Sequence, residues 1–187
     1  MHRRHLNTLL ERYATAWPGE ADIVNRFRAF VATHDDCLLR SCVPGHITAS
    51  AWILSPDRRS ALLTHHKKLG RWLQLGGHVD GEAVIEASAL REAREESGMA
   101  HFEFEPWAGD VLVPLDLDVH SIPARRTEPE HDHWDVRFLL RAMPGQEPVL
   151  SEEGTDLRWF SLAEIPTVTD EESVLRLLRK AAMRREG

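Results

Sequence analysis

Apolar residues in the first part of the chain recur at helical spacing in two successive runs. The first run is Leu6, Leu9, Leu10, Tyr13 and Trp17, and the second is Ile23, Val24, Phe27, Phe30 and Val31. The turn-forming pair Pro18-Gly19 stands between them. Because spacings of three and four residues put side chains on one face of a helix, the pattern predicts a helical hairpin over residues 1–35. We expect this hairpin to pack against the rest of the molecule; a lid and a dimer surface are the alternatives.

From Ile47 onward the spacing changes to the shorter period of strands. Strands are predicted over residues 47–55, 60–66, 71–75, 111–119, 134–142 and 156–161. The segment 121–131, which contains two prolines and several charges, is predicted to be a loop. Helices are predicted over about residues 83–97 and after Thr169 and Glu172, whose spacing is that of a capping box. This order of elements predicts the α/β class, with a mixed sheet in an α/β/α sandwich.

Strict alternation marks the strand predicted over residues 111–119. Leu115, Leu117 and Val119 alternate there with Asp116 and Asp118. Successive side chains of a strand point to opposite faces of the sheet. The three apolar residues therefore predict one buried face, and the two aspartates belong to the other face.

Composition excludes several classes of protein. Of the 187 residues, 42% are hydrophobic and 28% charged. No apolar run approaches the ~20 residues of a membrane span, and the first residues lack the apolar stretch of a secretory signal. The net charge of −7 argues against a general nucleic-acid binder. Cys37 and Cys42 are too few for a disulfide framework, so we expect reduced thiols in a cytoplasmic protein.

The helix predicted over about residues 83–97 carries a cluster of charges in its last turns. Glu92, Glu95 and Glu96 are spaced so that their carboxylates lie on one face. The like charges repel each other, and they also oppose the helix dipole near its C-terminus. A divalent cation relieves both effects, and Mg²⁺ prefers carboxylates together with substrate phosphates. The cluster therefore predicts metal-assisted chemistry on a phosphorylated substrate. The alternative, a solvated charged helix face, is disfavoured by the opposite side, which holds Ala83, Ala87, Leu90, Ala93 and Ser97.

The segment from Gly76 to Met99 resembles the signature of the Nudix hydrolase superfamily. That signature is Gly, five residues, Glu, seven residues, and then Arg-Glu-apolar-x-Glu-Glu-x-Gly-apolar. Counted from Gly77, its second half is complete, with Arg91, Glu92, Ala93, Glu95, Glu96, Gly98 and Met99 in place. The early glutamate is displaced, because Ala83 stands at its position and Glu82 comes one residue before it. The resemblance extends over roughly residues 45–165 and indicates an atypical member of the superfamily.

The resemblance implies a Nudix-type α/β/α sandwich and roles for individual residues. Residues 1–40 would be an N-terminal helical extension and residues 41–187 the Nudix hydrolase domain. Glu92, Glu95, Glu96 and the backbone carbonyl of Gly76 would bind Mg²⁺ or Mn²⁺, and Gly98 would end the helix in a left-handed cap.

The resemblance also implies which residues would orient the carboxylates and which would act as the general base. Arg91 would orient the carboxylates through a bidentate pair. The general base would be a motif glutamate, Glu92 or Glu95, or a glutamate from elsewhere in the fold. Glu153 is the candidate from elsewhere, and its neighbour Glu152 would serve equally well. The alternative for both is an exposed acidic loop.

Eleven histidines are the unusual part of the composition. His46 precedes the first strand and His78 lies inside the glycine turn. His131, His133 and Asp135 follow the spacing His-x-His-x-Asp, which would put the three side chains on one side of a strand. Imidazole and carboxylate together are ligands for transition metals, so these five residues are candidates for a second metal or for substrate binding. A polar rim that binds no metal is the alternative.

A related branch of the superfamily offers a different interpretation. Isopentenyl-diphosphate isomerase has a metal site of histidine and glutamate ligands, and the segments 45–52 and Gly77-His78 resemble parts of it. Its catalytic cysteine should precede the Gly-His pair, but Gly76 stands there, and Cys37 and Cys42 are distant in sequence. The complete Arg-Glu-x-x-Glu-Glu set therefore favours a hydrolase. A third hypothesis is a Nudix domain that binds a ligand with little catalysis.

The function predicted from the sequence is divalent-metal-dependent hydrolysis of a diphosphate (phosphoanhydride) linkage. The substrate would be a nucleoside diphosphate derivative or a similar small molecule, and water would attack phosphorus. The expected partner is this small phosphorylated substrate, neither nucleic acid nor a membrane, and a homodimer is a further expectation. Since specificity in such folds lies outside the motif, residues 121–134 and the N-terminal hairpin are expected to determine the substrate.

Overall fold

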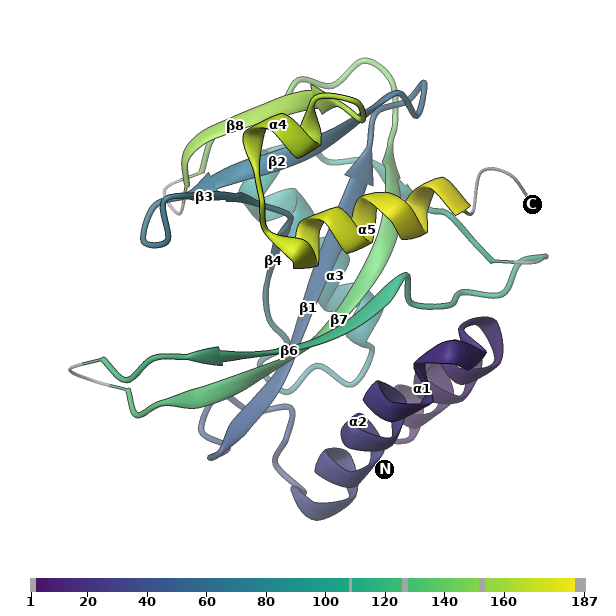
Figure 1. Ribbon diagram of the computed structural model, residues 1–187, viewed down its shortest axis with the longest axis vertical. Helices are drawn as coiled ribbons and strands as arrows, with labels where there is room; N and C mark the ends of the chain where they lie inside the picture. The colour runs from purple at the N-terminus through teal and green to yellow at the C-terminus, as the bar shows by residue number, and fades with distance from the viewer. Residues whose placement is uncertain (1–2, 108, 126–127, 152–153, 184–187) are drawn as a thin grey trace.

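The computed structural model describes residues 3–107, 109–125, 128–151 and 154–183. The N-terminal part forms a helical hairpin, which confirms the prediction for that segment. Its helices are α1 (Arg4–Ala16) and α2 (Ala21–Thr33), joined by the short 3₁₀ helix η1 (Pro18–Glu20). The two helices lie side by side at one end of the molecule (Figure 1). Pro18 opens η1, where a missing N–H removes no helical hydrogen bond.

In the described part of the chain, eight strands form one mixed sheet centred on two long parallel strands. The strands are β1 (Gly45–Leu54), β2 (Ser60–His66), β3 (Arg71–Leu73), β4 (Leu75–His78), β5 (Phe102–Phe104), β6 (Asp116–Ile122), β7 (His131–Ala142) and β8 (Gly154–Ser161). β1 and β7 pair in parallel along their length, and the other pairings between these strands are antiparallel. β2 and β4 pair with β1, β5 and β6 pair with β7, and β3 and β8 pair with β2.

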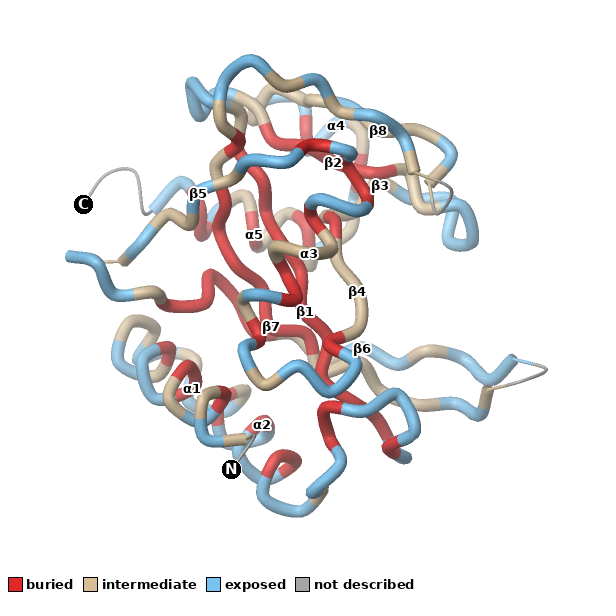
Figure 2. Tube along the Cα trace, turned by 180° about the vertical axis from the view of Figure 1, so that it is seen from behind, coloured by how far each residue is buried: buried red, intermediate tan, exposed pale blue. Residues whose placement is uncertain are grey.

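Helices cover both faces of the central strands. α3 (Ile85–Ser97) lies on one face, and α5 (Glu172–Met183), which follows the short α4 (Ile165–Val168), lies on the other (Figure 1). Every residue of β1 is buried, as expected for a strand that is covered on both faces (Figure 2). The layers confirm the predicted α/β/α sandwich. No helix within the described ranges is long and apolar enough to cross a membrane.

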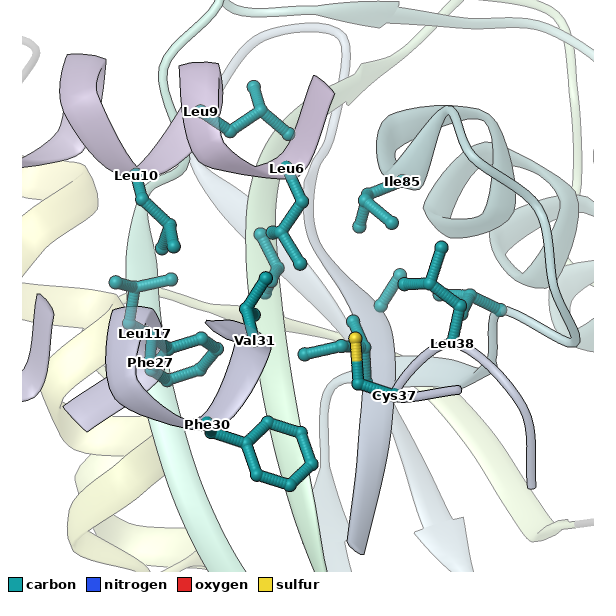
Figure 3. Close-up of a cluster of buried hydrophobic side chains, with 14 of the residues drawn as sticks. Leu6, Leu9, Leu10, Phe27, Phe30, Val31, Cys37, Leu38, Ile85 and Leu117 are labelled. Atoms are coloured by element: carbon teal, nitrogen blue, oxygen red, sulfur yellow. The ribbon is translucent and has the colours of Figure 1, made fainter. Parts of the chain in front are cut away.

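The N-terminal hairpin packs on the same face of the sheet as α3. Its apolar side chains join those of the following loop, of α3 and of the sheet in one cluster (Figure 3). The cluster includes Leu6, Leu9, Leu10, Phe27, Phe30, Val31, Cys37, Leu38, Ile85 and Leu117. The hairpin therefore contributes to the main core, which is the packing role expected from its hydrophobic pattern.

The boundaries predicted between residues 111 and 134 are wrong. β6 begins at Asp116 and continues to Ile122, and β7 already begins at His131, so the two strands include both ends of the predicted loop and form a two-stranded arm (Figure 1). The described residues between them, 123–125 and 128–130, lie outside the strands, as the loop prediction expects. Cross-strand pairing of Ile122 with His131 extends the ladder into polar sequence that shows no hydrophobic period. The sequence pattern also does not predict β5, because three residues are too few to show an alternation.

The aspartate face of β6 is also covered. Asp116 is fully buried and Asp118 is half-buried, because α5 lies over this face and supplies Arg176 and Lys180 as partners. Arg137, from the neighbouring strand β7, is buried between the same two aspartates. Alternation on β6 therefore separates an apolar buried face from an ionic buried face.

The left-handed cap predicted for the motif helix is confirmed at Gly98, whose φ is 67°. A Cβ there would also lie 2.9 Å from the Val149 Cβ. Gly98→Ala is expected to lower the free energy of unfolding by about 1–2 kcal/mol, because a left-handed conformation is costly for alanine. Urea denaturation measures the change. Gly19→Ala is the control, since within the described ranges no atom beyond its two chain neighbours lies within 4 Å of its added Cβ. An equal loss in both variants would contradict the prediction.

Candidate active site

Gly76 and Gly77, predicted to lie in a turn, belong to β4 and pair with β1, and the turn follows at Asp80 and Gly81. We call residues 76–81 the glycine turn, and its first two glycines allow an unusually close approach of main chain and side chains. Gly76 has a φ of 158°, and a Cβ there would lie 2.6 Å from the Ser50 Cα and 2.7 Å from the Ala49 oxygen. A Cβ on Gly77 would lie 2.7 Å from the Cδ of Glu92 on α3. Only glycine fits both positions without displacement of a neighbour. The glycine turn is therefore shaped around β1 on one side and around a motif carboxylate on the other.

The three motif glutamates differ in their exposure. Glu96 is buried, and its Oε2 accepts a hydrogen bond from the Gly76 N–H at 2.9 Å. The side chain of Glu92 is 14% exposed and that of Glu95 is 59% exposed. The predicted carboxylate face thus runs from the buried glycine turn out to solvent.

Arg91 connects two of these carboxylates to the main chain of the glycine turn. Its Nη1 lies 2.7 Å from Glu92 Oε1 and 3.0 Å from Glu95 Oε2. Its Nη2 donates to the carbonyl oxygen of His78 at 2.7 Å. The expected bidentate pair with one carboxylate is therefore replaced by a bridge, in which one nitrogen serves two carboxylates and the other holds the backbone.

The donor atoms at this turn are suited to a hard divalent cation. Three carboxylates and nearby backbone carbonyls offer oxygen ligands, which Mg²⁺ and Mn²⁺ prefer. Glu92, Glu95 and Glu96 do not form one of the groups of three ligand atoms that lie within 4.8 Å of one another in the described ranges. Arg91 and the Gly76 N–H hold the carboxylates at separate positions. The fit of these residues to a divalent cation therefore rests on their oxygen donors and on the close approach that the glycines allow.

The general base stays a prediction. Glu153 and its neighbour Glu152 lie outside the described residues. Of the two motif candidates, Glu95 is open to solvent, whereas Glu92 is largely enclosed and contacts Arg91.

Four histidines predicted as second-site residues lie together where β1, β4 and β7 meet. The ring centroid of His46 lies 4.9 Å from that of His78 and 5.0 Å from those of His131 and His133. The strand register explains part of this, because His46 on β1 pairs with His133 on β7. We call His46, His131 and His133 the histidine cluster, with His78 at its edge.

Burial lowers the pKa of three of these four histidines. Burial first, and then neighbouring imidazoles, lower the pKa of His46 to about 4 and that of His133 to about 2. Burial also lowers the pKa of His78. A neutral imidazole carries a lone pair on one ring nitrogen, which is the form that binds metals.

The carboxylate of Asp135 has its hydrogen-bond and ion-pair partners outside the histidine cluster. Its carboxylate accepts hydrogen bonds from Ser50 at 2.7 Å and Thr48 at 3.1 Å, and it pairs with Arg137 at 2.8 Å. The spacing His-x-His-x-Asp thus places the three residues along one strand face, but the carboxylate serves a buried ion pair.

Sequence reasoning missed His120. It pairs with His133 across β6 and β7, and the two ring centroids lie 5.4 Å apart. Its Nδ1 lies 3.0 Å from Asp118 Oδ2. The sequence did hold a signal for it, because His120 continues the polar alternation of Asp116 and Asp118 by one position. The predicted strand ended at residue 119, so His120 was left out.

Known proteins share this fold. Residues 44–179 match the family model described as NUDIX domain. No curated protein sequence matches the chain significantly. A NUDIX-family hydrolase from Clostridium perfringens has a similar structure, with a TM-score of 0.58 and 22% identity over 74% of this chain and 97% of that one. A C. elegans Ap4A hydrolase in a binary complex has a TM-score of 0.55 and 20% identity, over 75% of this chain and 98% of that one. The NUDIX domain of Shewanella oneidensis NrtR, complexed with ADP ribose, has a TM-score of 0.53 and 20% identity, over 84% and 97% of the two chains.

The family match and the structural likeness support different conclusions. The identities to the three solved structures are below 25%, so they show the fold. The family match spans most of the chain and contains the whole segment from Gly76 to Met99. The chain therefore belongs to the Nudix family, as its resemblance predicts, and is a Nudix-type pyrophosphohydrolase.

Proposed function

We propose that the protein hydrolyses a diphosphate linkage in a nucleoside diphosphate derivative, with Mg²⁺ or Mn²⁺ as cofactor. Glu92, Glu95, Glu96 and the Gly76 carbonyl would hold the cation. A bound divalent cation would neutralise charge on the phosphate oxygens and make a coordinated water more acidic. Water would attack one phosphorus, the bridging P–O bond would break, and the bridging oxygen would leave with the other phosphate.

The observation that carries this proposal is the fixed position of the carboxylate face against the glycine turn. Arg91 anchors Glu92 and Glu95 to the carbonyl of His78, and the Gly76 N–H holds Glu96. Side chains that are already positioned need no reorganisation when charge develops on the phosphates. Glu95 reaches solvent, so this end of the face is open to a substrate.

Two similar structures favour a nucleotide as the source of the diphosphate. One is an Ap4A hydrolase and another holds ADP ribose, and both of these compounds contain phosphoanhydrides joined to adenosine. The net charge of −7 does not oppose an anionic substrate, because a bound cation reverses the local sign.

The isomerase alternative is disfavoured by the positions of the cysteines. Cys37 and Cys42 are buried in the apolar cluster beneath the N-terminal hairpin. Burial raises the pKa of Cys37 to about 11 and that of Cys42 to about 12. Neither thiol belongs to the glycine turn, where an isomerase of this kind would need it.

A substrate panel tests the proposal. The purified chain would be incubated with Ap4A, ADP ribose, nucleotide sugars, nucleoside triphosphates, coenzyme A and isopentenyl diphosphate, with Mg²⁺, with Mn²⁺ or with EDTA. We expect cation-dependent cleavage of at least one nucleotide. Binding of a nucleotide without turnover would favour a ligand-binding domain, and isomerisation of isopentenyl diphosphate would favour the isomerase.

Gly77→Ala is expected to lower kcat by about 10–100-fold with little loss of stability. The added Cβ meets the far end of the Glu92 side chain, which can move, and a displacement of about 1 Å in a catalytic group is sufficient for such a loss. Steady-state kinetics and thermal melting measure the two effects. Gly76→Ala is the contrast, because its Cβ meets the main chain of β1 and should lower the Tm as well. Unchanged kcat in Gly77→Ala would contradict the assigned position of Glu92.

A further inference from the structure

We propose that the histidine cluster of His46, His131 and His133 is a second metal site, which binds a divalent first-row transition metal such as Zn²⁺. The site is separate from the carboxylates of α3 and goes beyond the proposed function. One ring nitrogen from each of the three residues lies within 4.8 Å of the others. The three ligands come from two strands that are hydrogen-bonded to each other, so the ladder of β1 and β7 fixes their spacing.

Three buried ring nitrogens of the histidine cluster have no hydrogen-bond partner in the described part of the chain. His46 is 3% exposed, and neither Nδ1 nor Nε2 has a hydrogen-bond partner in the described structure. The buried Nε2 of His133 also has none. A buried polar atom without a partner is costly, and such atoms in a folded protein point to a missing ligand. One ring nitrogen of His46 lies within 4.8 Å of a ring nitrogen of each of the other two residues, which makes a shared ligand the direct explanation.

A neighbouring carbonyl orients the imidazole of His131 as a metal site requires. His131 Nδ1 lies 2.8 Å from the carbonyl oxygen of Pro129, so Nδ1 carries the proton and Nε2 keeps its lone pair. The adjacent His120 has the same arrangement with Asp118. Metal-bound histidines typically donate their other N–H to a carbonyl or carboxylate in this way.

The ligand chemistry selects the class of metal. Three imidazole ligands suit Zn²⁺, Ni²⁺ or Cu²⁺, whereas Mg²⁺ prefers oxygen. Three protein ligands leave a fourth coordination position for water or a small anion. A second group, His34, Asp36 and Cys42, is also close enough to share an ion. Its Cys42 thiol has a pKa of about 12, raised by burial and then by a hydrogen bond with Asp36, so it is a weaker candidate.

Zinc binding by the full chain tests the site without any substrate. The protein would be dialysed against Zn²⁺ in excess Mg²⁺, and bound zinc would be measured by elemental analysis. We expect about one Zn²⁺ per chain, as for a single tetrahedral site. His46→Gln and His131→Gln should lose at least tenfold in affinity, since even the loss of an outer hydrogen bond costs about 10–100-fold. His131 is only half-buried, so this variant should fold even if His46→Gln does not.

Three control variants locate the metal. His101→Gln removes an exposed imidazole, Cys42→Ser disables the second group, and Glu96→Gln alters the carboxylate face. All three should retain zinc, and Co²⁺ bound to the wild type should show the intense visible absorption of tetrahedral nitrogen coordination. Absence of bound zinc in the wild type would overturn the proposal. Zinc lost in Cys42→Ser or Glu96→Gln but kept in folded His131→Gln would also overturn it. These results are independent of hydrolysis, so either proposal can fail alone.

Discussion

Glu96→Gln is expected to reduce kcat/KM for the diphosphate substrate by about 10²–10³-fold and to leave the fold intact. The amide keeps an oxygen that can accept the hydrogen bond from the Gly76 N–H, so the buried turn retains its shape. It removes the negative charge that would hold the proposed cation. A divalent cation contributes several kcal/mol to transition-state stabilisation, and each ~1.4 kcal/mol corresponds to tenfold in rate. Steady-state kinetics at saturating Mg²⁺ and thermal melting measure the two effects.

Glu86→Gln is the matched control on the same helix. Glu86 lies in the first turn of α3 and contacts His5, away from the glycine turn. Its substitution removes the same charge and should leave the rate nearly unchanged. If both variants lost activity equally, the loss would be due to the change in the total charge of the helix and not to the position of Glu96. Wild-type turnover in Glu96→Gln would disprove the role of this carboxylate.

The largest expected change in stability belongs to Arg137→Met, which should lower the free energy of unfolding by about 3–5 kcal/mol. Arg137 is 2% exposed and lies 2.8 Å from Asp135, 2.9 Å from Asp118 and 3.3 Å from Asp116. Methionine fills much of the volume but leaves buried carboxylates with less compensating charge. Because total stabilities are typically about 5–15 kcal/mol, such a loss is easily seen in urea denaturation.

Two further variants separate charge from packing. Arg179→Met removes an exposed arginine that pairs with Glu172, and it should change stability by less than about 1 kcal/mol. Asp135→Asn in the Arg137→Met background should recover part of the loss, because it removes one uncompensated charge. A double variant no more stable than Arg137→Met alone would show that packing, and not charge, explains the effect.

Hydrophobic periodicity predicted most of the fold, because most elements have one apolar face. The N-terminal hairpin was predictable from the spacing of Leu6, Leu9 and Leu10. The position of the motif helix was predictable too, but its packed side was only partly right: Ala93 and Ser97 are buried, whereas Ala87 is exposed and Ala83 precedes the helix. The periodicity failed where another interaction replaces the apolar contact. Asp116 is buried by ion pairs with residues distant in sequence, and β6 and β7 continue into a polar arm through backbone pairing.

The candidate site was predictable where one helix carries it. The positions of Arg91, Glu92, Glu95 and Glu96 follow from helical spacing and a family motif. The partners of these residues depend on the path of β4, so the bridge from Arg91 to the His78 carbonyl could not be read from the sequence. The inclusion of His120 and the separate pairing of Asp135 depend on the register of β6 and β7 and on the burial of Arg137.

His78 takes part in both sites through different atoms. Its main-chain oxygen holds Arg91, while its ring lies beside His46 and His133. Every amino acid has that carbonyl, so the support for the carboxylate face does not depend on which side chain occupies position 78. Exchange of the imidazole would change only the environment of the histidine cluster. During evolution, a substitution at position 78 can therefore change the surroundings of the histidine cluster while the support for the carboxylate face stays the same.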